Sequence, residues 1–153
     1  MKNHRVIATH WQIESARRGA LKTVILAYKN PVIHVGDRLY LAEQWCECPP
    51  YGFFLESTTP EAEMLGWQPA ETMPPEAAAH WYEVWWVRTA RLGQVSFRSF
   101  AGSGLHLICP EVDYPSYEHR AAWNESYPHT PWDDDLWVQI LEVERVSEFP
   151  LKT

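Results

Sequence analysis

The stretch WYEVWWVRTARL, residues 81–92, gives the strongest strand signal of this chain. Aromatic and β-branched residues dominate it, a composition that is typical of a β-strand. A strand here places Trp85 and Trp86 on opposite faces, because successive side chains of a strand alternate. Tryptophans on strands are more often buried than exposed, so we expect Trp85 or Trp86 to lie in the core.

Further strands are predicted on both sides of this stretch. The apolar segments at 21–28 and 135–146 are rich in large and β-branched residues and favour strands. A tight turn at Gly36-Asp37 is followed by Leu39 and Leu41, which alternate with their neighbours as in a half-buried strand. Together with residues 81–92, these segments predict a sheet-based fold.

Short helices and one irregular segment complete the expected structure. Residues 12–19, QIESARRG, predict a helix that ends at Gly19, and residues 114–127 predict one or two further helical turns. Residues 46–80 are rich in proline, so we expect an irregular excursion there that holds short helices at most.

Length and charge limit the possible classes of protein. The 153 residues suffice for one domain with a sizeable core, and we expect residues 1–153 to form a single domain. The 13 Lys and Arg against 20 Asp and Glu give a net charge of −7, which disfavours a strongly basic nucleic-acid binder. No apolar run of about 18 residues occurs, so no membrane span is expected. The first residues lack an apolar signal core, and a cytoplasmic protein is expected.

No cofactor or metal is expected. The sequence contains no phosphate-binding loop, dinucleotide fingerprint or nucleophile elbow. Cys46, Cys48 and Cys109, with a histidine such as His106, are the combination that suggests zinc. The Cys-x-Cys spacing lacks the second paired motif of a typical structural zinc site, so we expect three separate thiols.

Four segments, taken in order, resemble the ASCH branch of the PUA-like superfamily, in particular its small phage and prophage members. They are RRGALKTVIL at 17–26, VGDRLYLAEQW at 35–45, WQPAETMPPEAA at 67–78 with YEVWWVRTARL at 82–92, and YPHTPWDDDLWVQILEVERV at 127–146. The resemblance covers about residues 10–146. It implies an α+β fold, a small and mostly antiparallel PUA-like β-barrel flanked by short helices.

The resemblance implies a binding module that takes a nucleobase or single-stranded RNA, modified bases included, in a cleft beside the Gly36-Asp37 turn. Glu43 would accept hydrogen bonds from a base edge, two tryptophans would stack on the base, and basic residues would hold phosphate. The expected nucleic-acid-binding residues are Arg17, Arg18, Lys22, Arg38, Glu43, Trp45 and Trp132. A looser second basic cluster contains Arg88, Arg91 and Arg98.

Each of these residues also has an ordinary structural explanation, which stays open. Glu43 is equally suited to an ion pair with Arg38 or Lys22, and strand tryptophans are more often core residues. The basic residues are explained as well by ordinary surface charge.

Two other functions remain open. Some relatives resemble amidohydrolases that remove the acetyl group of N4-acetylcytidine, and in an enzyme of that kind Lys22, Thr23 and Glu43 would be catalytic. The family's threonine position falls on Ile25 here, so we favour a binding module over an enzyme. The third function is a phage-type inhibitor that binds a basic protein through an acidic surface, with Asp133-Asp134-Asp135 as its most acidic run.

Overall fold

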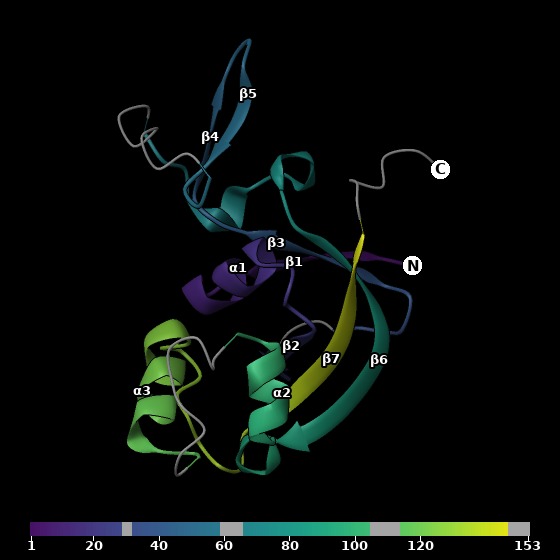
Figure 1. Cartoon of the computed structure of the whole chain (residues 1–153), viewed down its shortest axis with the longest axis vertical. Helices are drawn as coiled ribbons and strands as arrows, with labels where there is room; N and C mark the ends of the chain where they lie inside the picture. Colours follow the sequence, from purple (N-terminus) through teal and green to yellow (C-terminus); the bar gives the residue numbers. More distant parts are fainter. Residues whose placement is uncertain (29–31, 59–65, 105–113, 147–153) are drawn as a thin grey trace. The chain divides into compact units, whose positions relative to one another are not determined.

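The computed structural model describes residues 1–28, 32–58, 66–104 and 114–146 (Figure 1). The chain divides into two compact units, each described here by itself. The first contains Met1–Ala8, Asp37–Glu83 and, of the described C-terminal residues, Arg145 and Val146; the second contains Thr9–Gly36 and Val84–Glu144. That the whole chain is a single domain stays a prediction.

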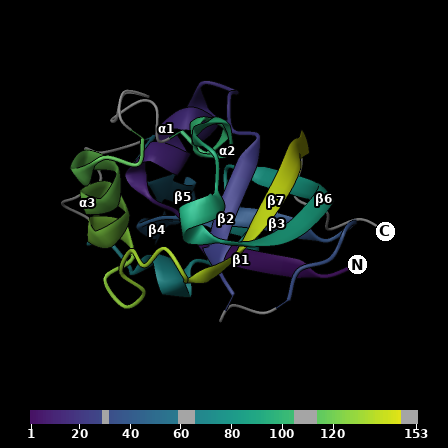
Figure 2. The same ribbon diagram turned by 90° about the horizontal axis from the view of Figure 1, so that it is seen from below.

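The fold is α+β with a mixed, mostly antiparallel sheet, as expected. The hydrogen-bonded order of its five strands is β1-β3-β6-β7-β2, and β4 and β5 form a separate two-stranded sheet. The long strands are β6 (Trp81–Arg91) and β7 (Trp137–Val146), which each contribute residues to both units. Figures 1 and 2 show β2 (Thr23–Ala27), β7 and β6 side by side. Closure of the sheet into a barrel stays a prediction.

The first unit is built on β1 (Asn3–Ile7) and β3 (Arg38–Ala42), which run parallel. Strand β3 pairs antiparallel with the first three residues of β6. Asp37 anchors the start of β3, because its carboxylate accepts the Lys2 backbone N–H at 3.0 Å and lies 2.9 Å from His4 Nε2. A small apolar cluster contains Ala42, Leu55, Met73 and Ala77.

Within residues 46–80 the prediction of an irregular segment was wrong in part. The structure has an antiparallel hairpin of β4 (Trp45–Cys48) and β5 (Gly52–Leu55). Proline marks the turn rather than the strands, since Pro49-Pro50 connects them and Gly52 has a φ of +93°. The short helices were predicted correctly: η2 (Ala70–Thr72) and η3 (Pro75–Ala77) are single 3₁₀ turns.

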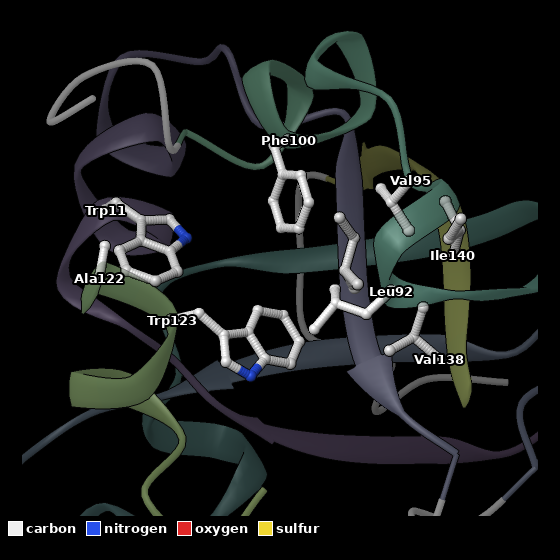
Figure 3. Close-up of a cluster of buried hydrophobic side chains, with 9 residues drawn as sticks. Trp11, Leu92, Val95, Phe100, Ala122, Trp123, Val138 and Ile140 are labelled. Atoms are coloured by element: carbon white, nitrogen blue, oxygen red, sulfur yellow. The ribbon is translucent and has the colours of Figure 1, made fainter. Parts of the chain in front are cut away.

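The second unit packs three helices around the antiparallel pair β2–β7. These are α1 (His10–Arg17), α2 (Phe97–Gly102) and α3 (Tyr117–Ser126), with a short turn η4 (Leu92–Gln94) after β6. Figure 3 shows the core that they share, whose central members are Phe100 and Trp123, with ring centroids 6.2 Å apart and nearly perpendicular. The cluster contains Trp11, Ile25, Leu92, Val95, Phe100, Ala122, Trp123, Val138 and Ile140.

The predicted helix at 12–19 is α1, but it begins two residues earlier. Thr9 caps it: its hydroxyl accepts the Gln12 backbone N–H at 3.2 Å, and the Gln12 side chain accepts the Thr9 N–H at 2.9 Å. Gly19, with a φ of +70°, follows the helix end as predicted. Among the described residues, no helix has the length and apolar character needed to cross a membrane.

The expectation that Trp85 or Trp86 lies in the core was wrong. Trp85 is 57% exposed and Trp86 is 44% exposed, whereas Trp81, Tyr82 and Val84 of the same strand are buried. Alternation in a sequence fixes which residues share a face, but it does not reveal which part of a long strand is covered. Only the beginning of β6 is covered on both faces.

Candidate functional site

The structure divides the predicted site residues between the two units. The second unit contains Arg17, Arg18, Lys22, Thr23 and Trp132, and the first contains Arg38, Glu43 and Trp45.

A part-buried hydroxyl–carboxylate pair lies at the beginning of β2. Thr23 is 3% exposed, and its hydroxyl donates to Glu142 Oε2 at 3.1 Å. The two residues are direct cross-strand partners in the β2–β7 pair. Sequence analysis missed Glu142, because no local pattern connects residues 119 positions apart. The carboxylate beside Thr23 therefore comes from the last strand.

Gly102 allows helix α2 to approach this pair closely. A Cβ atom at Gly102 would lie well inside van der Waals contact of Thr23 Oγ1. The Gly102 carbonyl also accepts the Lys22 backbone N–H at 2.9 Å. The glycine thus fixes the end of α2 against the beginning of β2.

Lys22 is held by its backbone and exposes its side chain. Its carbonyl accepts the Val143 N–H at 2.9 Å, so Lys22 extends the ladder between β2 and β7 by one residue. Successive side chains of an extended strand point to opposite faces, and the exposures agree: Lys22 is exposed and Thr23 is buried. The structure therefore brings Thr23 to Glu142 and leaves the Lys22 ammonium in solvent.

The other predicted basic residues of the second unit make surface ion pairs. Arg17 and Arg18 both contact the Glu14 carboxylate, at 3.4 Å and 3.1 Å. All three side chains are at least 41% exposed. Exposed pairs of this kind contribute about 0–1 kcal/mol, so both guanidinium groups can exchange Glu14 for a phosphate at little cost.

Trp132 is mostly a packing residue. Its ring stacks on Phe100 with centroids 5.9 Å apart and an interplanar angle of 28°, and it meets Trp123 edge-on at 6.1 Å. Its indole N–H donates to Asp134 at 2.9 Å. Half-buried by these contacts, Trp132 offers a ligand only part of its ring.

In the first unit, Glu43 and Trp45 are fixed by different partners. Glu43 is 8% exposed and accepts the Ser57 backbone N–H at 2.8 Å. The Trp45 indole N–H donates to the Pro69 carbonyl at 3.2 Å and to Thr72 Oγ1 at 3.1 Å. Trp45 therefore connects the hairpin to η2, and its half-exposed ring is held rigidly.

Arg38 opens strand β3 in the first unit. Its backbone N–H donates to the Lys2 carbonyl at 2.8 Å, and it lies directly opposite Glu83 in the β3–β6 pair. The side chain is half-buried. Its register suits an ordinary cross-strand charge pair as well as a ligand contact.

Two guanidinium groups of the looser basic cluster lie over exposed tryptophans of the second unit. Arg88 Cζ is 5.7 Å from the centre of the Trp86 ring, and Arg91 Cζ is 5.2 Å from the centre of the Trp137 ring. Arg–aromatic contacts of this length are favourable cation–π interactions.

Metal ligation is not indicated in the part of the chain that the structure describes, where no three His, Cys, Asp or Glu side chains come together. Cys46 is buried and Cys48 is half-buried, both as free thiols. Cys109 and His106 lie outside the described residues.

Comparisons with known proteins show the fold. No protein-family model and no curated protein sequence matches the chain. Solved structures are similar to it, and two of them are described here. The ASCH domain from Lactobacillus crispatus JV V101 has a TM-score of 0.50 and 11% identity, over 94% of this chain and 79% of that one.

The second is a protein of Enterococcus faecalis V583 from the family model DUF984, with a TM-score of 0.55 and 10% identity, over 100% of this chain and 85% of that one. At these identities the likeness is one of fold. The chain shares its fold with these two proteins, one of which is an ASCH domain.

Proposed function

We propose that this protein is a nucleic-acid-associated binding module that takes an unpaired base of single-stranded RNA, modified bases included. The observation that carries the proposal is the Thr23–Glu142 pair at 3.1 Å, next in sequence to the exposed Lys22. A carboxylate accepts hydrogen bonds from the exocyclic amine of a base, and an ammonium neutralises phosphate. The ASCH-type fold supports the same class of ligand.

In the second unit, Glu142 takes the base-reading role that the sequence suggested for Glu43. Thr23 orients its carboxylate from the neighbouring strand, so that less conformational freedom is lost when a base binds. Lys22, Arg17 and Arg18 contact phosphates from the exposed side of this unit. Glu43, Trp45 and Arg38 in the first unit, and Trp132 in the second, stay part of the proposal as residues that contact the RNA.

The test is binding of a fluorescently labelled single-stranded RNA, followed by anisotropy over a series of salt concentrations. We expect Lys22→Ala to weaken binding several-fold and to reduce the salt slope by about one, because one phosphate contact is lost. We expect Glu142→Gln to weaken binding with no reduction of that slope, since it removes a base contact. Arg120→Ala, which removes an exposed charge from α3 in the same unit, is the matched control. Equal affinities for all three variants and the wild type would overturn the proposal.

A second candidate, an amidohydrolase for N4-acetylcytidine-like nucleosides, is favoured by one observation. A buried threonine hydroxyl that donates to a carboxylate has the geometry of an activated nucleophile with its base. Hydrolysis would add water across the amide C–N bond and release acetate and cytidine. We rank it second because Lys22 and Thr23 point to opposite faces. Release of acetate that disappears in both Thr23→Val and Glu142→Gln would reverse the ranking.

A further inference from the structure

An exposed row of side chains crosses three strands of the second unit. The Tyr28 backbone N–H donates to the Trp137 carbonyl at 2.9 Å, one residue beyond the Ala27–Val138 pair of β2 and β7. These two residues therefore lie opposite each other on the same face. The Arg91 guanidinium of β6 lies 5.2 Å from the centre of the Trp137 ring. Tyr28, Trp137 and Arg91 form what we call the aromatic row.

The aromatic row is exposed, although it lies directly next to residues of the buried core. Trp137 is 49% exposed and Tyr28 is 46% exposed, whereas Val138, the next residue of β7, is fully buried. Large aromatic side chains usually bury most of their area when they fold into a core. Two of them left in solvent on neighbouring strands mark a surface that a partner covers.

The side chains of the row suit unpaired nucleobases. Tyrosine and tryptophan rings on adjacent strands of a sheet provide flat faces on which successive bases stack, whatever the base sequence. Arg91 holds its guanidinium over the Trp137 ring, where it is available both to a base and to the adjoining phosphate. A purely apolar partner would make no use of this charge.

The ionic contact of Arg91 is weak enough to exchange. Arg91 lies 3.3 Å from Asp135, and the two side chains are 48% and 79% exposed. Water screens a pair of this kind almost completely. Asp133 and Asp134 are also exposed on the segment that precedes β7, and they repel the dense phosphates of a duplex. The row thus favours a short single strand held mainly through its bases.

We propose that the aromatic row is a stacking surface for two successive bases of single-stranded RNA, with Arg91 exchanging Asp135 for a backbone phosphate. The inference rests on the proposed function for the identity of the ligand. It concerns other residues than the Thr23–Glu142 pair, because Trp137 and Glu142 are five residues apart in β7 and therefore point to opposite faces.

The test measures the affinity of the full-length protein for a labelled single-stranded RNA, with matched variants. Tyr28→Ala and Trp137→Ala should each weaken binding about tenfold, since each removes one stacked base. Tyr117→Ala and Trp85→Ala are the controls: they remove aromatic rings that are 82% and 57% exposed elsewhere in the same unit. Trp137→Phe keeps a flat ring and should retain most of the affinity. A loss that is seen in Trp137→Ala but not in Trp137→Phe is therefore caused by the missing ring and not by misfolding.

The outcomes separate the two proposals. Unchanged affinity in Tyr28→Ala and Trp137→Ala, together with weaker binding in Lys22→Ala, overturns the aromatic row and leaves the proposed function standing. Equal losses in the Trp85→Ala and Tyr117→Ala controls also overturn it, because the effect would then belong to any exposed ring. Failure of the wild type to bind RNA overturns both proposals.

Discussion

Gly102 is the residue at which helix and strand approach most closely in the second unit. Replacing it with alanine would place a Cβ atom in a steric clash with Thr23 Oγ1, so either the helix or the strand must shift. We expect Gly102→Ala to lower the free energy of unfolding by about 1–3 kcal/mol, the usual cost of overpacking. Urea denaturation followed by tryptophan fluorescence measures the change.

The double variant Gly102→Ala/Thr23→Ala tests the cause. Removing the hydroxyl takes away the nearest clashing atom, so the two substitutions together should cost less than the sum of the single effects. Strict additivity would show that the cost of Gly102→Ala arises elsewhere in α2.

We expect two half-buried tyrosines to make the fold less stable at alkaline pH. Burial raises the pKa of Tyr114 and of Tyr127 above the ordinary value of 10.0, and the Gln12 side chain offsets part of the shift in Tyr127. A pKa that is higher in the folded state stabilises the fold fully below about pH 10, and this stability is lost as the pH rises further. The free energy of unfolding should therefore fall above about pH 10, by up to 1.4 kcal/mol per pH unit for each such tyrosine.

Tyr114→Phe isolates one of these contributions. The Tyr114 hydroxyl donates to the Val95 carbonyl at 2.9 Å, so the variant should lose some stability at neutral pH. Its free energy of unfolding should, however, decline less steeply above about pH 10. Urea denaturation at several pH values gives both quantities. Tyr117→Phe, at a position that is 82% exposed, should keep the wild-type slope. An unchanged slope in Tyr114→Phe would contradict this account.

At the scale of single residues, the sequence indicated which side chains could have a chemical role, but not which residues they contact. It singled out Lys22 and Thr23, but the partner of Thr23 is Glu142, which only the pairing of β2 with β7 brings near. It also favoured Trp85 or Trp86 for the core, whereas both are exposed. Contacts across a sheet depend on which strands pair and in which register, and a single sequence does not specify either.

At the scale of elements, the cap of α1 gives a direct test. Thr9 and Gln12 satisfy each other's backbone N–H groups at the beginning of this helix. Thr9→Ala removes the hydroxyl and should lower the free energy of unfolding by about 1 kcal/mol. Thr9→Ser, which keeps the acceptor, should stay close to the wild type in thermal denaturation. A loss of the same size in both variants would show that packing of the Thr9 methyl group matters more than the cap.

Elements with a strong local signal were predicted, whereas β1, α2 and the β4–β5 hairpin were not. The helix at α1, the strands β2, β6 and β7 and the turn at Gly36 follow from alternation and from glycine. The β4–β5 hairpin was missed, because proline and glycine around its turn resemble an irregular segment. An isolated hairpin has little stability of its own, so tertiary contacts such as that of Trp45 with η2 fix it.

At the scale of the whole molecule, a net charge of −7 has to be reconciled with an anionic ligand. Both proposed surfaces combine a few cations with groups that contact bases: Lys22, Arg17 and Arg18 with Glu142 in the first, and Arg91 with Trp137 in the second. The affinity should therefore depend moderately on salt, with a slope that corresponds to about four phosphates at most. Duplexes, whose bases are hidden in the stack, should bind less tightly than single strands.

The measurement that tests the central claim most directly is a titration of tryptophan fluorescence with single-stranded RNA, duplex DNA, cytidine and N4-acetylcytidine, at low and high salt. We predict quenching by single-stranded RNA that weakens modestly with salt, and little response to the duplex. Quenching by a free nucleoside in addition would indicate a pocket for one base. No response to any of these ligands would contradict the account and would leave a protein partner as the explanation for the exposed aromatic residues.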